Sequence, residues 1–327
     1  MIAPAFTPDD VAREVVAADA RIRPYIRVTP LEYSPVLSRD TGCDVFLKLE
    51  NTQVTGSFKA RGAFNKLLSL SEAERARGIV TASTGNHALA TVYALAILGI
   101  AGEIFLPRSA SPVKIAGLEI RGADLHIVDD DPGTVEIIAR RHAEESGRVY
   151  ISPYNDPQVI GGQGTIAIEL LRQAARMDAV FVPVGGGGLI AGIAGYLAAN
   201  SAGAHVLGCQ PDASPIMARS TEAGELVDMP NADTLSDATA GLVEPGAITF
   251  PICQSCVDEW VLASEEELRA AIRLVVTHHS TLVEGAGALA VAALRRAAPR
   301  YRGQSVVLVL SGSHIATGAL AGVLGAS

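Results

Sequence analysis

Short apolar runs recur along the chain, and they constrain the fold more than any other feature. Most are rich in Val, Ile and Phe and lead through Gly, Ser or Pro into a helical pattern; they cover residues 45–49, 79–82, 103–106, 125–128, 180–184, 206–209 and 306–310. Nearly continuous apolar strands that alternate with helices are typical of parallel sheets with helices on both faces. The pattern therefore predicts an α/β fold.

Three helix starts support this prediction. Thr7, Ser71 and Ser264 each precede a helical pattern as an N-cap does, and Ser264 with Glu267 forms the S-x-x-E capping box. The sequence has no repeat, no low-complexity linker and no shift in composition that would mark a domain boundary. A second lobe is therefore expected as an insertion and not as a tail.

Composition narrows the classes of partner. The 327 residues are 49% hydrophobic, which is enough for one large core or for two lobes that share a cleft. A net charge of -9 and the absence of Lys or Arg runs argue against nucleic acid and membranes as partners, so small molecules are expected. The N-terminus has no secretion-signal pattern, which predicts a cytoplasmic location. The cysteines are interpreted as scattered thiols without a zinc or redox role: Cys43, Cys209, Cys253 and Cys256.

A lysine near a predicted helix start is the first candidate for chemistry. Residues 55–62 read TGSFKARG and lead from an apolar strand into a helical stretch. Ser57 is a natural N-cap, which puts Lys59 in the first helical turn. The positive end of a helix disfavours another positive charge, so the amine of Lys59 should lose its proton more easily and condense with an aldehyde. The alternative is an ordinary solvated lysine on a surface helix.

A run of four glycines is the second candidate. Gly185, Gly186, Gly187 and Gly188 stand between a predicted strand and a helix that begins near Leu189. Glycines let the backbone approach an anion closely, and free N–H groups at a helix start can point at a phosphate. The run lacks the spacing of nucleoside triphosphate and dinucleotide loops. A phosphate site is favoured over a flexible tight turn.

Two further loops follow predicted strands. The first, with Ser83, Thr84, Gly85, Asn86 and His87, offers hydroxyls, an amide and free backbone donors, which suit a carboxylate. His87 alone is more typical of a core residue than of a catalyst. The second loop begins with Ser311 after the last strand, where a hydroxyl could reach a ring nitrogen.

In this order, the motifs resemble the fold type II pyridoxal phosphate enzymes, and among them the threonine/serine dehydratase and serine racemase family. The resemblance covers nearly the whole chain and includes residues 159–165, 244–246 and 284–288. It implies a two-lobed α/β fold like that of the tryptophan synthase beta chain. A large cofactor-binding domain is expected from residues 1–69 and 151–327, with a small domain, 70–150, inserted between them. A homodimer is also expected.

The resemblance also implies a role for individual residues. Lys59 would hold pyridoxal 5'-phosphate as a Schiff base, and the glycine run with Leu189 would hold its phosphate. The loop from Ser83 to His87 would take the carboxylate of an amino acid substrate. Asn86 would donate a hydrogen bond to the phenolic oxygen of the cofactor, and Ser311 would pair with its pyridine nitrogen. The residues expected around the cofactor ring are Phe58, Asn86, Gly241, Glu284 and Ser311.

The implied activity is β-elimination. A serine hydroxyl cannot keep the pyridine nitrogen protonated as an aspartate would, so the cofactor is a milder electron sink. This suits loss of a β-hydroxyl directly after Lys59 removes the α-proton, giving a 2-oxo acid and ammonia from threonine, serine or a related β-hydroxyamino acid. Such an enzyme is a threonine/serine ammonia-lyase.

Alternatives stay open. Thr84 stands where racemising members of the family have serine, so an amino acid racemase is not excluded. Gly285 and Tyr154 depart from the usual pattern, so the dehydratase could be specialised for 3-hydroxyaspartate or an intermediate of ectoine breakdown. Gln210 and Ile216 replace the acids of metal-stimulated relatives, and no metal-binding residues are expected. A non-enzymatic protein that binds a phosphorylated ligand at the glycine run is a further alternative.

Overall fold

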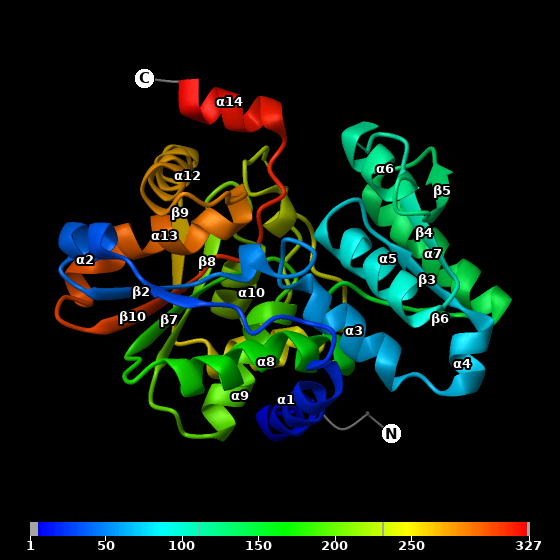
Figure 1. Cartoon of the computed structure of the whole chain (residues 1–327), viewed down its shortest axis with the longest axis horizontal. Helices are drawn as coiled ribbons and strands as arrows, with labels where there is room; N and C mark the ends of the chain where they lie inside the picture. The colour runs from blue at the N-terminus through cyan, green and yellow to red at the C-terminus, as the bar shows by residue number, and fades with distance from the viewer. Residues whose placement is uncertain (1–5, 111, 231, 326–327) are drawn as a thin grey trace.

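The chain folds around two β-sheets, as a computed structural model shows for residues 6–110, 112–230 and 232–325. In the larger sheet β1 pairs antiparallel with β2, and the other neighbours pair in parallel. Its strands, in spatial order, are β1 (Leu31–Tyr33), β2 (Asp44–Lys48), β10 (Ser305–Val309), β7 (Ala179–Pro183), β8 (His205–Pro211) and β9 (Glu259–Ala263). Strands from the first and last parts of the chain therefore meet in one sheet, where Figure 1 shows β2 in blue beside β10 in orange-red.

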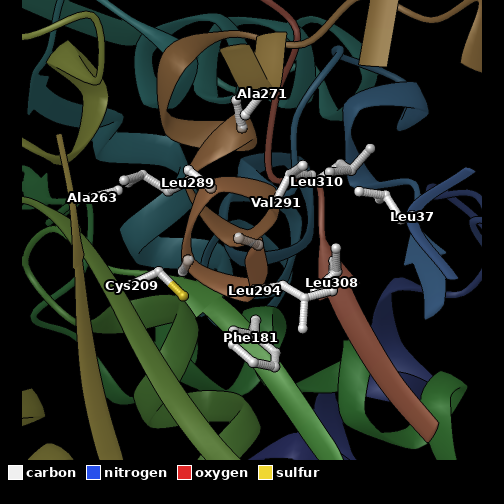
Figure 2. Packing of buried hydrophobic residues seen from close by; sticks show 14 of the residues in the cluster. Leu37, Phe181, Cys209, Ala263, Ala271, Leu289, Val291, Leu294, Leu308 and Leu310 are labelled. Carbon is white, nitrogen blue, oxygen red and sulfur yellow. The ribbon is translucent and has the colours of Figure 1, made fainter. Parts of the chain in front are cut away.

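Helices cover both faces of the larger sheet. Successive side chains of a strand point to opposite faces, and in β10 Val306 and Leu308 join one apolar cluster while Val307 joins another. On the first face the cluster gathers around α13 (Gly285–Ala297), where Phe181 and Leu308 pack beside Leu294 (Figure 2). The second face packs against α8 (Pro157–Gln173) and α9 (Gly188–Ala199). Burial on both faces explains why these strands are apolar throughout.

A smaller parallel sheet forms the second lobe, at the right of Figure 1. Its strands, in spatial order, are β5 (Asp124–Val128), β4 (Gly102–Pro107), β3 (Ile79–Ala82) and β6 (Val149–Tyr150). Apolar clusters join it to α7 (Pro132–Ser146) on one face and to α5 (Asn86–Leu98) and α6 (Pro112–Glu119) on the other. All four strands fall within residues 70–150, while the domain boundaries themselves stay a prediction.

The remaining helices surround these layers. Their bounds are α1 (Pro8–Ile22), α2 (Pro35–Thr41), α3 (Lys59–Ser69), α4 (Glu72–Arg77), α10 (Ile216–Ala223), α11 (Thr249–Cys256), α12 (Glu265–His279) and α14 (Thr317–Gly325), with short 3-10 turns η1 (Glu50–Thr52), η2 (Asp237–Thr239) and η3 (Ala298–Arg300). Among the described residues, no helix is both long enough and apolar enough to cross a membrane. Cys43, Cys209 and Cys253 are buried free thiols, and Cys256 is half-buried.

Most local predictions are confirmed. Each of the seven apolar runs contributes a strand, and Thr7, Ser71 and Ser264 each cap a helix in a capping box. The prediction that Ser57 caps a helix is wrong. The N-cap of α3 is Phe58, without a side-chain hydrogen bond, because Ser57 instead forms a β-bridge with Gly312. Lys59 nevertheless begins α3, as the prediction requires.

A buried ionic cluster fixes the position of α3. Arg61 Nη2 lies 2.8 Å from Glu50 Oε1, and Arg61 Nη1 lies 2.8 Å from Glu169 Oε1. Lys48 Nζ lies 2.6 Å from Glu169 Oε2. Burial alone would raise the pKa of Glu169, but the charges and hydrogen bonds of Arg61 and Lys48 lower it to about 2. Because these side chains come from β2, η1, α3 and α8, the cluster ties the start of α3 to the larger lobe.

Candidate active site

A cavity of about 350 Å³ opens beside the carboxyl ends of strands from both sheets. This is where open α/β sheets hold their ligands. The structure brings every predicted site residue to its wall: Phe58, Lys59, Ser83, Thr84, Gly85, Asn86, His87, Gly185, Gly186, Gly187, Gly188, Leu189, Gly241, Glu284 and Ser311. Residues that are far apart in the sequence thus form one site, although their individual roles stay predictions.

Lys59 presents its amine inside this cavity. Its side chain is half-buried, with Nζ 2.7 Å from the carbonyl oxygen of Pro153 and 5.2 Å from the ring centre of Phe58. Burial lowers the pKa of Lys59 from 10.5 to about 8, whereas the charge of Glu284 acts to raise it. The predicted direction is confirmed, but burial is the main cause and the helix end is not. The alternative of a fully solvated lysine is wrong.

The glycine run forms a narrow turn between β7 and α9. Gly187 has a φ of +89°, which side-chain-bearing residues rarely adopt. A Cβ on Gly186 would come within 2.6 Å of the Tyr154 ring, and one on Gly185 would come within 3.1 Å of Thr239 Cα. The turn therefore has no room for a side chain at these glycine positions. The first backbone hydrogen bond of α9 runs from the amide of Ala191 to the carbonyl oxygen of Gly187. The amides before Ala191 therefore have no partner within the helix and are free to bind an anion.

The loop from Ser83 to His87 leads into α5 and presents another helix start. Gly85 is the N-cap of α5, and no side chain caps this helix. Leu89 is the first residue whose amide bonds back to Gly85 O, so the amides between them have no partner within the helix. A free helix N-terminus favours an anion such as a carboxylate. His87 Nε2 lies 3.1 Å from Thr81 Oγ1, and burial lowers the pKa of His87 to about 3, so it stays neutral.

Asn86 joins the two lobes at the floor of the cavity. Its Nδ2 donates to Glu284 Oε1 at 2.7 Å, and its Oδ1 lies 2.6 Å from His314 Nδ1. Burial, and next the charge of Asp237, raises the pKa of Glu284 to about 7. These bonds hold the Asn86 amide in one orientation at the start of α5. Ser311 is buried at the end of β10, and Gly241 lines the cavity with a φ of +128°.

Several lining residues escape prediction from the sequence. Phe105, Lys114, Asp237 and Thr239 all line the cavity, and Lys114 Nζ lies 2.9 Å from Asp237 Oδ2. This ion pair links α6 of the smaller lobe with η2 of the larger one across the cavity mouth. No local pattern could have revealed it, because each residue belongs to a segment with ordinary composition.

Comparisons with known proteins identify the family. Residues 22–312 match the model of the pyridoxal-phosphate dependent enzyme family. The chain belongs to this family. The enzyme is 39% identical to an L-threonine ammonia-lyase of Thermotoga maritima over 302 residues, which cover 92% of the enzyme and 75% of that relative.

Solved structures agree with this assignment. A processed threonine deaminase from Solanum lycopersicum has a TM-score of 0.90 at 32% identity, covering 97% of the enzyme and 93% of that chain. Maize serine racemase has a TM-score of 0.89 at 30% identity, covering 96% of both chains. The prediction of a fold type II pyridoxal phosphate enzyme is confirmed, and the non-enzymatic alternative is set aside.

The cavity fits the cofactor of this family. Lys59 offers an amine to an aldehyde, the glycine turn offers free amides to a phosphate, and Ser311 places a hydroxyl on the wall of the same cavity. No carboxylate is predicted beside the ring nitrogen, so a neutral pyridine fits better than a protonated one. The enzyme is pyridoxal phosphate dependent, and the residue roles stay predictions that can be tested singly.

The lowered pKa of Lys59 predicts a pH dependence for cofactor attachment. Only the neutral amine attacks an aldehyde. With a pKa of about 8, half of the amine is neutral at pH 8, so the neutral fraction rises steeply below that pH and can at most double above it. The rate of chromophore formation, when pyridoxal phosphate is added to cofactor-free enzyme, should therefore rise toward pH 8 and level off above it. Stopped-flow absorbance measures this rate. A rate that keeps rising toward the ordinary lysine pKa of 10.5 would contradict the prediction.

Gly187→Ala should weaken cofactor binding about tenfold or more. The new Cβ would lie 3.0 Å from Met217 Cε and from Thr249 Cβ, at a φ of +89° that costs a side chain roughly 1–2 kcal/mol. Relief of this strain would move the free amides of the turn. Gly203→Ala is the matched control, since Gly203 has a φ of +68° with nothing within 4 Å. Titration with pyridoxal phosphate should show a loss for the first variant only.

Proposed function

We propose that the enzyme is a dehydratase that converts a β-hydroxy-L-amino acid, with L-threonine as the leading substrate, into a 2-oxo acid and ammonia. The observation that carries the proposal is the meeting of three groups in one cavity: the Lys59 amine, the Ser311 hydroxyl and the free start of α5. A related protein with 39% identity is an L-threonine ammonia-lyase, which supports threonine as the substrate.

The start of α5 is suited to hold the substrate carboxylate. Its free amides and helix dipole favour an anion. The neutral His87 adds no competing charge, and the side chains of Ser83 and Thr84 add hydroxyl donors. A carboxylate held there points the rest of the amino acid toward Lys59. This orientation selects amino acids over other amines.

Lys59 is suited to move the α-proton. With a pKa of about 8 its amine is a base near neutral pH, where catalytic bases are most effective. Pyridoxal phosphate, when bound, supplies an electron sink for the electrons left by that proton. Lys59 Nζ accepts the proton, and the Pro153 carbonyl, 2.7 Å away, helps to orient the amine. The ring of Tyr154 packs against Gly186 of the glycine turn.

The β-hydroxyl is the leaving group in this proposal. Ser311 would hold the pyridine nitrogen of bound pyridoxal phosphate without protonating it, and the cofactor would then supply a milder electron sink that favours loss of a β-substituent. Water leaves first, and hydrolysis of the remaining enamine releases ammonia and the 2-oxo acid. No described residue is required to hold a metal for this step.

A substrate panel tests the proposed function. The purified holoenzyme is given L-threonine, L-serine and 3-hydroxyaspartate, and 2-oxo acid is measured with and without added magnesium. We expect 2-oxo acid from L-threonine at least, with no dependence on magnesium. A higher rate with 3-hydroxyaspartate would assign the specialised alternative. Failure of every β-hydroxyamino acid to yield an oxo acid would reject dehydration.

A racemase is the second candidate. The likeness to maize serine racemase and the presence of the Thr84 hydroxyl in the cavity favour it. Chiral chromatography of serine and threonine separates the two candidates. Under the dehydratase proposal, oxo acid forms faster than the D-enantiomer, and Thr84→Ala retains oxo acid formation. Faster inversion that Thr84→Ala abolishes selectively would make the enzyme a racemase. The expected homodimer and cytoplasmic location stay predictions.

A further inference from the structure

Three potential ligands converge in the smaller lobe, apart from the glycine turn and Lys59. They are Glu103 on β4, His126 on β5 and His142 on α7. Glu103 Oε2 lies 3.2 Å from His126 Nε2 and 2.7 Å from His142 Nε2. Asp124 Oδ1 lies 3.9 Å from His126 Nε2, at the exposed side of the group. Two imidazole nitrogens thus lie within 3.2 Å of one carboxylate oxygen.

The carboxylate at the centre lacks the hydrogen bonds that its burial demands. Glu103 is only 8% exposed, and its Oε2 has no hydrogen-bond partner. His142 Nε2 also has no hydrogen-bond partner, although it lies only 2.7 Å from Glu103 Oε2. A buried polar atom without a partner costs free energy. Two neighbouring atoms left in this way indicate that a third species satisfies both.

The spacing fits a shared metal ion. Nitrogen and oxygen ligands lie about 2.0–2.1 Å from zinc, so two ligands at tetrahedral corners lie about 3.3 Å apart. The distance of 3.2 Å between Glu103 Oε2 and His126 Nε2 matches this edge, and 2.7 Å to His142 Nε2 is slightly short of it. The ligand atoms of Glu103, Asp124 and His126 all lie within 4.8 Å of one another, and His142 lies outside this group but approaches Glu103 Oε2 to 2.7 Å.

We propose that Glu103, His126 and His142 form a binding site for a divalent transition-metal ion of the zinc type. Two imidazoles with one carboxylate favour such an ion over magnesium or calcium, which prefer oxygen ligands. Arg148 Nη1 pairs with Glu103 Oε1 and so orients the carboxylate from behind, as outer-shell partners of metal ligands do. Both histidine side chains are more than a third exposed, which leaves an entry path for the ion.

The proposed site lies behind one wall of the cavity. The Phe105 ring stacks on His126 with ring centres 4.5 Å apart, and Phe105 also lines the cavity. The amide of Ser83 donates to the Phe105 carbonyl at 3.2 Å. A metal ion would therefore brace β4, β5 and α7 beneath the loop that begins with Ser83. The proposal departs from the sequence-based expectation of no metal-binding residues, which rests on the cysteines and on Gln210 and Ile216.

Calorimetric titration with zinc chloride tests the proposal. The holoenzyme is first dialysed against a chelator and then titrated at constant pH. We expect one zinc ion per chain. Loss of an outer-shell partner alone costs about 10–100-fold in affinity, so His126→Ala and His142→Ala should each weaken binding at least tenfold, and the double variant should abolish it.

A matched control keeps the test specific. His205 is an exposed histidine in the larger lobe, so His205→Ala should leave zinc binding unchanged. The visible chromophore and circular dichroism of each variant report whether the fold and the cofactor are retained. His126→Gln repeats the measurement if the alanine variant does not fold. The proposal is overturned if the wild-type enzyme binds no zinc, or if folded variants of both histidines bind it as tightly as the wild type.

Discussion

Replacing Lys59 by alanine should remove the visible chromophore and lower 2-oxo acid formation by about a thousandfold or more. Among the described residues that line the cavity, Lys114 is the other lysine, and it is paired with Asp237. General acid–base catalysis alone contributes about 10²–10⁴-fold to a rate. Absorbance spectra with pyridoxal phosphate, and mass spectrometry after borohydride reduction, follow attachment. The reduced adduct should be absent from the variant.

Lys59→Arg serves as the matched variant for this prediction. It keeps the positive charge beside Glu284 but offers no neutral amine, since a guanidinium is not deprotonated in proteins. Both variants should be equally inactive, and both should retain the wild-type circular dichroism. Activity of the alanine variant within tenfold of the wild type would remove Lys59 from the mechanism.

Arg61→Met should lower the free energy of unfolding by about 3–5 kcal/mol. Arg61 is fully buried and bonds to both Glu50 and Glu169. Its removal leaves both carboxylates buried, with Lys48 and Arg23 as the remaining ion-pair partners of Glu169 and no other ion pair to Glu50 among the described residues. Breaking a buried ion pair by removing one partner costs this much because an uncompensated charge remains in the interior. Urea unfolding followed by circular dichroism measures the change.

An exposed ion pair provides the contrast. Arg219 and Glu222 lie 2.8 Å apart with side chains 52% and 69% exposed, so Arg219→Ala should change stability by no more than about 1 kcal/mol. If the two variants lost similar amounts of unfolding free energy, Arg61 would act through packing and not through its charge. Since Arg61 lies two residues after Lys59, a folded Arg61 variant should also bind the cofactor more weakly.

The strands and helix caps were accessible to prediction because their causes are local. A strand buried on both faces needs a continuous apolar run, and a capping box needs two residues three apart. Strands β1, β6 and β9 were not predicted, since β1 and β6 are short and β9 is only partly buried. Ser57 misled the prediction because a serine before a helix suits an N-cap, whereas the distant Gly312 pairs with its backbone.

The cavity was predictable because its parts follow strand ends, where ligands of α/β proteins bind. Contacts between residues that lie far apart in the sequence could not be predicted. Arg61 and Glu169 are separated by 108 residues, and Lys114 and Asp237 by 123. Each is an ordinary charged residue on a helix or turn, and its importance arises only from burial or from its partner. The direction of the Lys59 pKa was foreseen, while its main cause required the tertiary structure.

The position of β10 has a consequence for synthesis of the protein. It is the last strand along the chain, yet it lies between β2 and β7. A ribosome makes the chain from its N-terminus, so β2 and β7 have emerged long before their shared neighbour exists. The small parallel sheet is complete by then, but the larger one has a gap at its centre with apolar edges exposed. The larger sheet can therefore close only after β10 has emerged, and the part of the site that follows β10, with Ser311, forms last.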